Sequence, residues 1–206
     1  WATLGIMQTA GESLEWFKNS FDSQEKSASK GDIFNQYNES AMTVPEGSEG
    51  LIFLPYLNGE RTPYWDSKAR GVFFGVNLKT GKSHFIRSIM EGVSFALRNN
   101  IETVESLGIN IDEVRAVGGG LKSQVWLNIL GKVLRKPIAT VSVSDTANLG
   151  NILLCGHALG IYPSYENAVN KMVSVDQRVD FNAGAEVYEK QYPVFLELYQ
   201  RVNSLF

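Results

Sequence analysis

The sequence predicts an α/β fold, in which helices pack against a sheet. Short apolar segments typical of strands alternate with segments whose apolar residues recur every three or four positions, as in helices. The chain has 206 residues, of which 44% are hydrophobic and 20% charged. This composition suits one globular domain with a sizeable core. No internal repeat or flexible linker divides the chain.

The first half of the chain alternates helices with two strands. A short helix is predicted after Gly11, and a second one over residues 32–42. Two strands are expected at residues 51–56 and 71–76, joined by a polar and aromatic loop. From Ser83 an apolar stripe at helical spacing predicts a long helix. Gly108 ends it, because glycine readily adopts the left-handed conformation that closes helices.

The second half repeats this alternation. A strand at residues 114–117 leads into three glycines, and a helix is expected to begin at once and to end before Pro137. A further strand at residues 138–143 follows. Three more helices are predicted after it, over residues 147–159, 165–172 and 186–202. Strands and helices that alternate in this order indicate helices layered on a sheet.

Composition excludes several classes of function. A formal net charge of -3 and scattered basic residues argue against nucleic acid as a partner. His84 and His157 are too few and too far apart to predict a metal site. The longest apolar runs are far below the roughly 18–20 residues that a membrane span needs. We therefore expect neither a metal site formed by protein side chains nor a membrane partner.

Two further features bear on the origin of the chain. The single cysteine, Cys155, fits a reducing compartment, so we expect a cytoplasmic protein. It lies in an apolar stretch and is predicted to be a buried structural thiol. The chain opens on Trp1 without an initiator methionine, which suggests a fragment whose upstream part is missing.

The glycines at positions 118–120 are the most informative feature for function. They stand between a strand and a helix, where bare backbone and a helix N-terminus can approach a phosphate or a nucleotide. The segment is not a P-loop, because Leu121 separates Gly120 from Lys122. It is a poor dinucleotide fingerprint, because Gln124 stands where the third glycine is needed. The alternative is a tight turn without a ligand, although a simple turn needs only one such glycine.

Three acidic residues could be taken for catalysts, but we favour structural roles for them. Glu60 and Asp66 lie in a loop rich in aromatic residues and proline, of a kind usually held by internal hydrogen bonds. Glu91 lies inside the long predicted helix, where a buried or capped carboxylate is the simpler interpretation.

Four segments resemble the FGGY carbohydrate kinases, in the order expected for that family. Residues 71–93, with His84 and the run from Ser88 to Val93, resemble the second signature of the family. Residues 54–63 are similar to the loop that precedes it, especially in xylulose and gluconate kinases. Residues 118–126 resemble the adenosine motif, and residues 1–16 a segment before it in the same lobe.

The resemblance implies a ribonuclease H-like, actin-like ATPase lobe with a mixed sheet and packed helices, incomplete at its N-terminus. Residues 1–206 would form the C-terminal, nucleotide-binding lobe, one of two lobes that clasp ATP and a sugar. The family's general base is an aspartate of the N-terminal half, so we expect no catalytic residue in this chain. The implied partners are MgATP, a small sugar and the N-terminal lobe, and a homodimer is compatible with the family.

Six positions match the nucleotide contacts of the family. Gly120 and Gln124 correspond to positions that contact adenine and its ribose, and Gly118 and Gly119 complete the turn. Gly11 falls where the family places a glycine against the nucleotide, and a helix N-cap is the alternative. Glu15 falls where a polar side chain lies near the adenosine, or is a solvated helix residue. Lys122 and Ser123 are expected to cap or flank the helix.

Two departures from the family are Asn148 and Asn151, where small residues usually let a helix pack beside the nucleotide. The function implied is ATP-dependent phosphorylation of a sugar hydroxyl, with xylulose as the expected substrate. Gluconate or another pentulose or polyol is the alternative. A module of another class, which binds a nucleotide or a partner without catalysis, also fits the sequence.

Overall fold

The computed structural model describes residues 2–22, 30–143, 145–180 and 184–206, and the side chains of residues 30–32 lie outside this description. Trp1, with which the chain opens, also lies outside the described residues. In the part that is described, no helix is long and apolar enough to cross a membrane.

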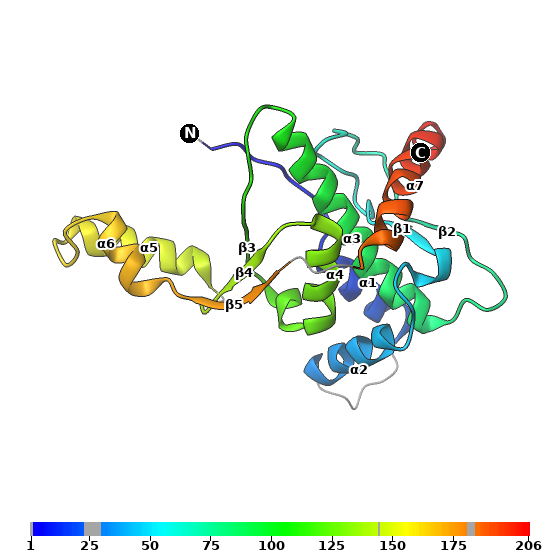
Figure 1. The fold of residues 1–206 in the computed structure, drawn as a ribbon, viewed down its shortest axis with the longest axis horizontal. Coiled ribbons are helices and arrows are strands. Elements are labelled where there is room, and N and C mark those ends of the chain that lie inside the picture. The colour runs from blue at the N-terminus through cyan, green and yellow to red at the C-terminus, as the bar shows by residue number, and fades with distance from the viewer. Residues whose placement is uncertain (1, 23–29, 144, 181–183) are drawn as a thin grey trace.

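A central helix, α3 (Lys82–Glu105), organises most of the molecule (Figure 1). It packs against α1 (Glu12–Phe21), α2 (Lys30–Met42), α4 (Gln124–Leu134) and α7 (Glu186–Val202). It also packs against β1 (Ile52–Leu54), which pairs with β2 (Val72–Phe74) in an antiparallel hairpin sheet. All three residues of β1 are buried, as expected of a strand that a helix covers.

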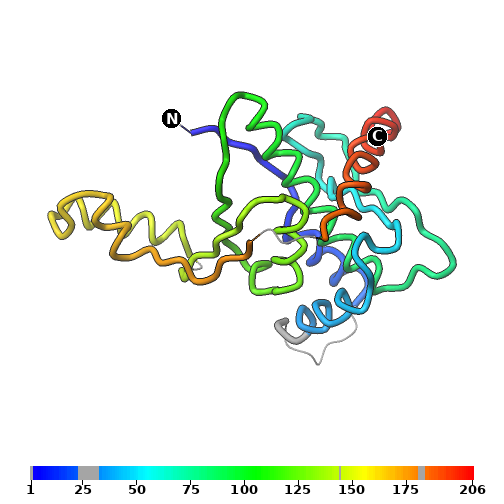
Figure 2. Tube along the Cα trace, viewed as in Figure 1, coloured from blue at the N-terminus to red at the C-terminus, as the bar shows by residue number. Residues whose placement is uncertain are grey.

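A second sheet is mixed and has the strand order β3-β4-β5. Strand β3 (Val114–Ala116) runs parallel to β4 (Ile138–Val141), with Val114 opposite Ile138. Strand β5 (Val175–Val179) runs antiparallel to β4. Between β4 and β5 the chain leaves the body through α5 (Thr146–Ala158) and returns through α6 (Tyr165–Met172) (Figure 2). These two helices form an arm on one side of the molecule (Figure 1).

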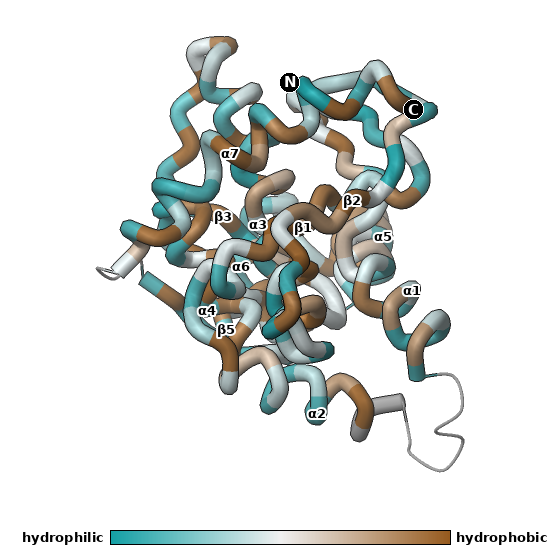
Figure 3. Tube along the Cα trace, turned by 90° about the vertical axis from the view of Figure 1, so that its right-hand side faces the viewer, coloured by the Kyte–Doolittle hydropathy of each residue, from teal (hydrophilic) through white to brown (hydrophobic). Residues whose placement is uncertain are grey.

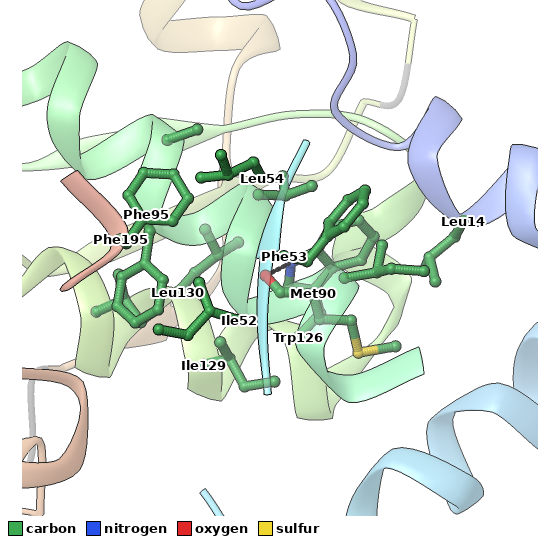
Figure 4. Close-up of a cluster of buried hydrophobic side chains, with 14 of the residues drawn as sticks. Leu14, Ile52, Phe53, Leu54, Met90, Phe95, Trp126, Ile129, Leu130 and Phe195 are labelled. Atoms are coloured by element: carbon green, nitrogen blue, oxygen red, sulfur yellow. Dashed lines mark hydrogen bonds between the residues drawn. The ribbon is translucent and has the colours of Figure 1, made fainter. Parts of the chain in front are cut away.

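The core lies between the hairpin sheet, α3, α4 and α7. The hydrophobic stretch around β1 and β2 runs through the middle of the molecule (Figure 3). Figure 4 shows Phe53 of β1 in one cluster with Met90 of α3, Leu14 of α1 and Trp126 of α4. The indole Nε1 of Trp126 donates to the Met90 carbonyl at 3.1 Å, which satisfies the polar end of a buried ring.

The predicted elements are confirmed in type and order. Helices α6 and α7 have the predicted bounds, and the long helix ends before Gly108, whose φ is 83°. The mixed sheet with packed helices is confirmed as well. Short 3₁₀ helices over Ser48–Gly50, Gly119–Lys122 and Asn203–Leu205 complete the elements.

Three expectations need correction. Strand β5 was not predicted, because three of its five residues are polar or charged and it lacks the apolar alternation of a strand. The α-helix does not begin directly at the glycines: a 3₁₀ helix over Gly119–Lys122 precedes α4. Cys155 is exposed and not buried, because α5 lies in the arm, where only Leu149 and Gly156 of this helix are buried.

Candidate functional site

A cavity of about 450 Å³ opens where three segments of the chain meet. It has the size and the mainly apolar walls of a small-molecule site. The segments are the start of α1, one face of α2, and the glycine turn with the first residues of α4. The lining residues are Gly11, Leu14, Glu15, Phe34, Asn35, Tyr37, Asn38, Gly119, Gly120, Lys122, Ser123 and Trp126.

The three glycines of the turn differ in what constrains them. Gly118 has φ 126° and ψ 168°, a backbone conformation that is essentially restricted to glycine. A Cβ on Gly120 would lie 2.9 Å from Cζ3 of Trp126, so packing excludes a side chain there. Gly119 has neither constraint: its φ is not positive, and a Cβ would meet nothing within 4 Å. Its bare backbone faces the cavity.

Gly11 faces the same cavity from the opposite segment. It is the N-cap of α1 without a side-chain cap, with φ -59°, so the N-cap interpretation is confirmed. A Cβ at Gly11 would also meet nothing within 4 Å. Neither backbone conformation nor packing therefore requires glycine at Gly11 or Gly119. Both leave room in the cavity that a side chain would fill.

The N-terminus of α4 is fixed at the wall of the cavity. Ser123 Oγ accepts a hydrogen bond from the backbone N–H of Trp126 at 3.1 Å, as a helix N-cap does. The expected capping role is thus confirmed. Ser123 and Lys122 also line the cavity.

Helix α2 supplies a wall that the sequence did not predict. Phe34, Asn35, Tyr37 and Asn38 recur at helical spacing and so share one face toward the cavity. Tyr37 is held from behind, where its hydroxyl donates to Asp22. Burial raises the pKa of Asp22, but hydrogen bonds from Lys82 and Tyr37 outweigh it and hold this pKa below its ordinary value. The pairing of two asparagines with two aromatic residues was the signal available in the sequence.

Two of the six matched positions do not line the cavity. Gly118 shapes the turn from outside it. The Gln124 side chain donates to Asn128 at 3.1 Å and accepts from Gln177 of β5 at 2.9 Å, which ties α4 to the mixed sheet. The family role of both residues stays a prediction. Glu15 lines the cavity and accepts a hydrogen bond from Lys18 at 2.8 Å.

The helix that carries Asn148 and Asn151 does not reach the cavity. Asn148 lies in the first turn of α5, where Asp145 caps the helix by accepting from its backbone N–H at 3.1 Å. Both asparagines are exposed in the arm. Neither side chain lines the cavity.

The segment that leads into Gly11 is anchored by the loop after β1. Glu60 Oε1 accepts from the backbone N–H of Gln8 at 3.2 Å and of Arg61 at 2.7 Å. The Thr9 hydroxyl donates to the Pro55 carbonyl. Glu60 is 3% exposed, and burial raises its pKa against the effect of these two N–H groups. The prediction that Glu60 holds the loop in place is confirmed, and it holds the approach to the cavity too.

Glu91 and Asp66 also have structural surroundings. Glu91 is buried and accepts from the Gly47 N–H at 2.9 Å, the Ser48 hydroxyl at 2.7 Å and Arg87 Nε at 2.8 Å. Asp66 accepts from the Tyr199 hydroxyl at 2.9 Å. Both residues lie outside the cavity. Across the described ranges, no group of three His, Cys, Asp or Glu residues is arranged to hold a metal ion.

Comparison with known proteins gives the class to which this fold and cavity belong. The model of the FGGY family of carbohydrate kinases, C-terminal domain, matches residues 1–159, more than half of the chain. The chain belongs to this family, and its fold is that of an actin-like ATPase.

Individual relatives agree with this assignment. A xylulose kinase of Staphylococcus epidermidis is 30% identical over 203 residues, which are 98% of this chain and 40% of the relative. A gluconokinase of Bacillus subtilis is 28% identical over 210 residues, which are 100% of this chain and 41% of the relative. A solved structure of ligand-bound xylulose kinase from Lactobacillus acidophilus matches with a TM-score of 0.81 and 27% identity, over 94% of this chain and 38% of that one. The chain thus spans about two fifths of the length of its relatives.

Proposed function

We propose that residues 1–206 form the C-terminal, nucleotide-binding lobe of an ATP-dependent carbohydrate kinase. The observation that carries the proposal is the cavity, which brings Gly11 and Glu15 together with Gly119 and Gly120. These four residues come from segments about 100 positions apart, and they are four of the six positions matched to the family's nucleotide contacts. Two of them are glycines whose missing side chains leave open space.

The cavity suits the adenosine part of ATP better than its phosphates. Its walls are largely apolar, with Leu14, Phe34 and Trp126 offering flat or aliphatic surface to a base. The N-terminus of α4, with its partial positive charge, lies at the wall of this cavity, and so does the Lys122 side chain. The phosphates would extend from there toward the rest of the enzyme.

The reaction proposed is transfer of the γ-phosphoryl group of ATP to a sugar hydroxyl. A bond forms between the hydroxyl oxygen and phosphorus, the bond to ADP breaks, and a base takes the hydroxyl proton. Such reactions depend on positioning and on electrostatic help from Mg²⁺ bound to the phosphates. The residues of this chain hold and orient the adenosine, while the aspartate base belongs to the N-terminal lobe.

Xylulose is the proposed sugar, because xylulose kinases are prominent among the relatives. Gluconate is the closest alternative, since a gluconokinase is similar over the whole chain. The sugar contacts are proposed to lie mainly on the N-terminal lobe, which is the partner of this one. A homodimer stays compatible with this proposal.

A kinase assay on the complete gene product tests this proposal. ADP release coupled to NADH oxidation would be followed with MgATP and each of xylulose, gluconate and glycerol. We expect turnover with one sugar, xylulose first, that disappears when Mg²⁺ is removed.

Turnover with none of the three sugars, while ATP still binds in calorimetry, would contradict the kinase proposal. That outcome would support the other class of function, a nucleotide-binding module without catalysis. Absence of both turnover and nucleotide binding would reject the assignment of the cavity itself.

A further inference from the structure

A hydrogen bond between Ser123 and Asn38 at the cavity wall fixes the orientation of the Asn38 side-chain amide. Ser123 Oγ already accepts from the Trp126 N–H, so its own proton needs an acceptor. Asn38 Oδ1, at 2.6 Å, is that acceptor. Ser123 is 7% exposed, and a buried hydroxyl without an acceptor would cost stability. The network therefore commits the oxygen of Asn38 to Ser123.

The other end of the amide, Nδ2, carries two N–H donors. Among the described residues it has no hydrogen-bond partner, and Asn38 lines the cavity. In small-molecule sites, a hydrogen-bond donor held in place beside apolar surface typically binds an acceptor atom of the ligand. The surrounding aromatic groups, Phe34 and Trp126, suit a flat heterocycle with acceptor atoms in its ring.

We propose that Asn38 is a specificity-determining residue, which donates through Nδ2 to a ring nitrogen of the bound nucleobase, with Ser123 as the positioning residue. The inference deepens the proposed function, since it rests on the cavity holding the base of a nucleotide. It assigns a role in base selection to helix α2, whose residues are not among the six matched positions.

The test uses analogues that lack one ring nitrogen each. Calorimetry on the complete gene product would compare ATP with 1-deaza-, 3-deaza- and 7-deaza-ATP, in which a C–H group replaces one acceptor. The wild-type protein should bind one of the three about tenfold more weakly than ATP, as expected for a lost hydrogen bond that leaves a donor unpaired.

The variant Asn38→Asp keeps an acceptor for Ser123 but presents an oxygen to the base in place of the donor. Its affinity for ATP should fall by about tenfold or more, and its preference for ATP over the discriminated analogue should vanish. The matched control is Gln36→Glu, the same amide-to-acid change on the exposed side of α2. It should leave both quantities unchanged.

Equal affinity of the wild-type protein for all four nucleotides would overturn the proposal without requiring any variant to fold. A preference that survives in Asn38→Asp would assign the donor to another residue. Because binding is measured without turnover, these outcomes are distinct from a failure of the kinase assay. No nucleotide binding at all would reject the proposed function together with this inference.

Discussion

At the scale of single residues, adjacent glycines in this chain have different reasons to be glycine. Gly118 adopts a backbone conformation that only glycine reaches readily. At Gly120, the Trp126 ring occupies the space that a side chain would need. Neither conformation nor packing requires glycine at Gly119, and we propose that its missing side chain leaves room for the nucleotide. The sequence predicted that the run of glycines exceeds the needs of a turn. The sequence could not show which of these glycines is free of internal constraints. The constraint on Gly120 depends on the position of Trp126, six residues later in the chain.

The sequence allowed the roles of some residues to be predicted, but not those of others. Structural roles for Glu60 and Glu91 were predicted from their neighbours, and the hydrogen bonds confirm them. The environment of Cys155 was predicted wrongly, because an apolar stretch usually marks a buried helix and α5 is an exposed one. The polar wall formed by Asn35 and Asn38 was missed although both recur with aromatic residues at helical spacing, because asparagines carry no charge that sets them apart.

Glu60 gives a prediction about pH. Burial raises its pKa in the folded protein above the unfolded value of about 4.3, and one carboxylate oxygen, Oε2, is buried with no hydrogen-bond partner among the described residues. Between these two pKa values the folded state binds more protons than the unfolded state. The contribution of Glu60 to stability is therefore largest at the acidic end of this window and declines as the pH rises through the folded pKa.

The variant Glu60→Gln keeps an acceptor for the N–H groups of Gln8 and Arg61 but does not titrate. Urea unfolding from about pH 4.5 to pH 7.5 should show the wild-type protein losing stability relative to this variant as the pH rises. A difference in the free energy of unfolding that is constant across this range, or that grows in favour of the wild-type protein, would disprove the assignment.

At the scale of elements, α3 and β1 approach each other closely at a glycine. The backbone of Gly92 lies so near the Phe53 carbonyl that a Cβ would be 2.2 Å from its oxygen. Because the obstacle is backbone and not a flexible side chain, a larger residue requires α3 to move away from the hairpin sheet. This contact helps to fix α3, which packs in turn against α1, α2 and α4 around the cavity.

We expect Gly92→Ala to lower the free energy of unfolding by at least about 2 kcal/mol, within the range for overpacked cores. The matched control is Gly150→Ala in α5, also a helical glycine, where a Cβ meets nothing within 4 Å. That substitution should be neutral or should stabilise by up to about 1 kcal/mol, since alanine favours helices. Equal effects of the two changes in thermal or urea unfolding would show that the α3–β1 contact is looser than described.

The elements themselves were predictable to differing degrees. Helices α6 and α7 and the long α3 have strong apolar periodicity, and their positions follow from it. Strand β5 pairs with β4 although its own residues are largely polar. Its strand conformation therefore follows from its hydrogen bonds to β4 and not from its own residue pattern. Local patterns cannot reveal an element that depends on pairing with a distant segment.

At the scale of the whole molecule, the cavity is a product of the fold. Its walls come from α1, α2 and the glycine turn, which are brought together because each packs on α3 or α4. Two of these walls were predicted by resemblance to the FGGY family, to which the chain belongs. The third was not, because the side of a helix that faces a cavity is decided by the packing of its neighbours. Cytoplasmic location stays a prediction of the sequence.

The central claim is that the cavity holds the nucleotide, and Gly119→Val in the complete gene product tests it most directly. This position is preferable to its neighbours because its φ is not positive and a Cβ added there meets no protein atom within 4 Å. Gly150→Val, where the added side chain also starts in open space but lies in the arm, is the matched control. Steady-state kinetics would give the KM for ATP and for the sugar. We predict that Gly119→Val raises the KM for ATP about tenfold or more, a loss of about 1.4 kcal/mol, with the KM for the sugar unchanged and the control like wild type. An unchanged KM for ATP, or an equal rise for both substrates, would contradict the account.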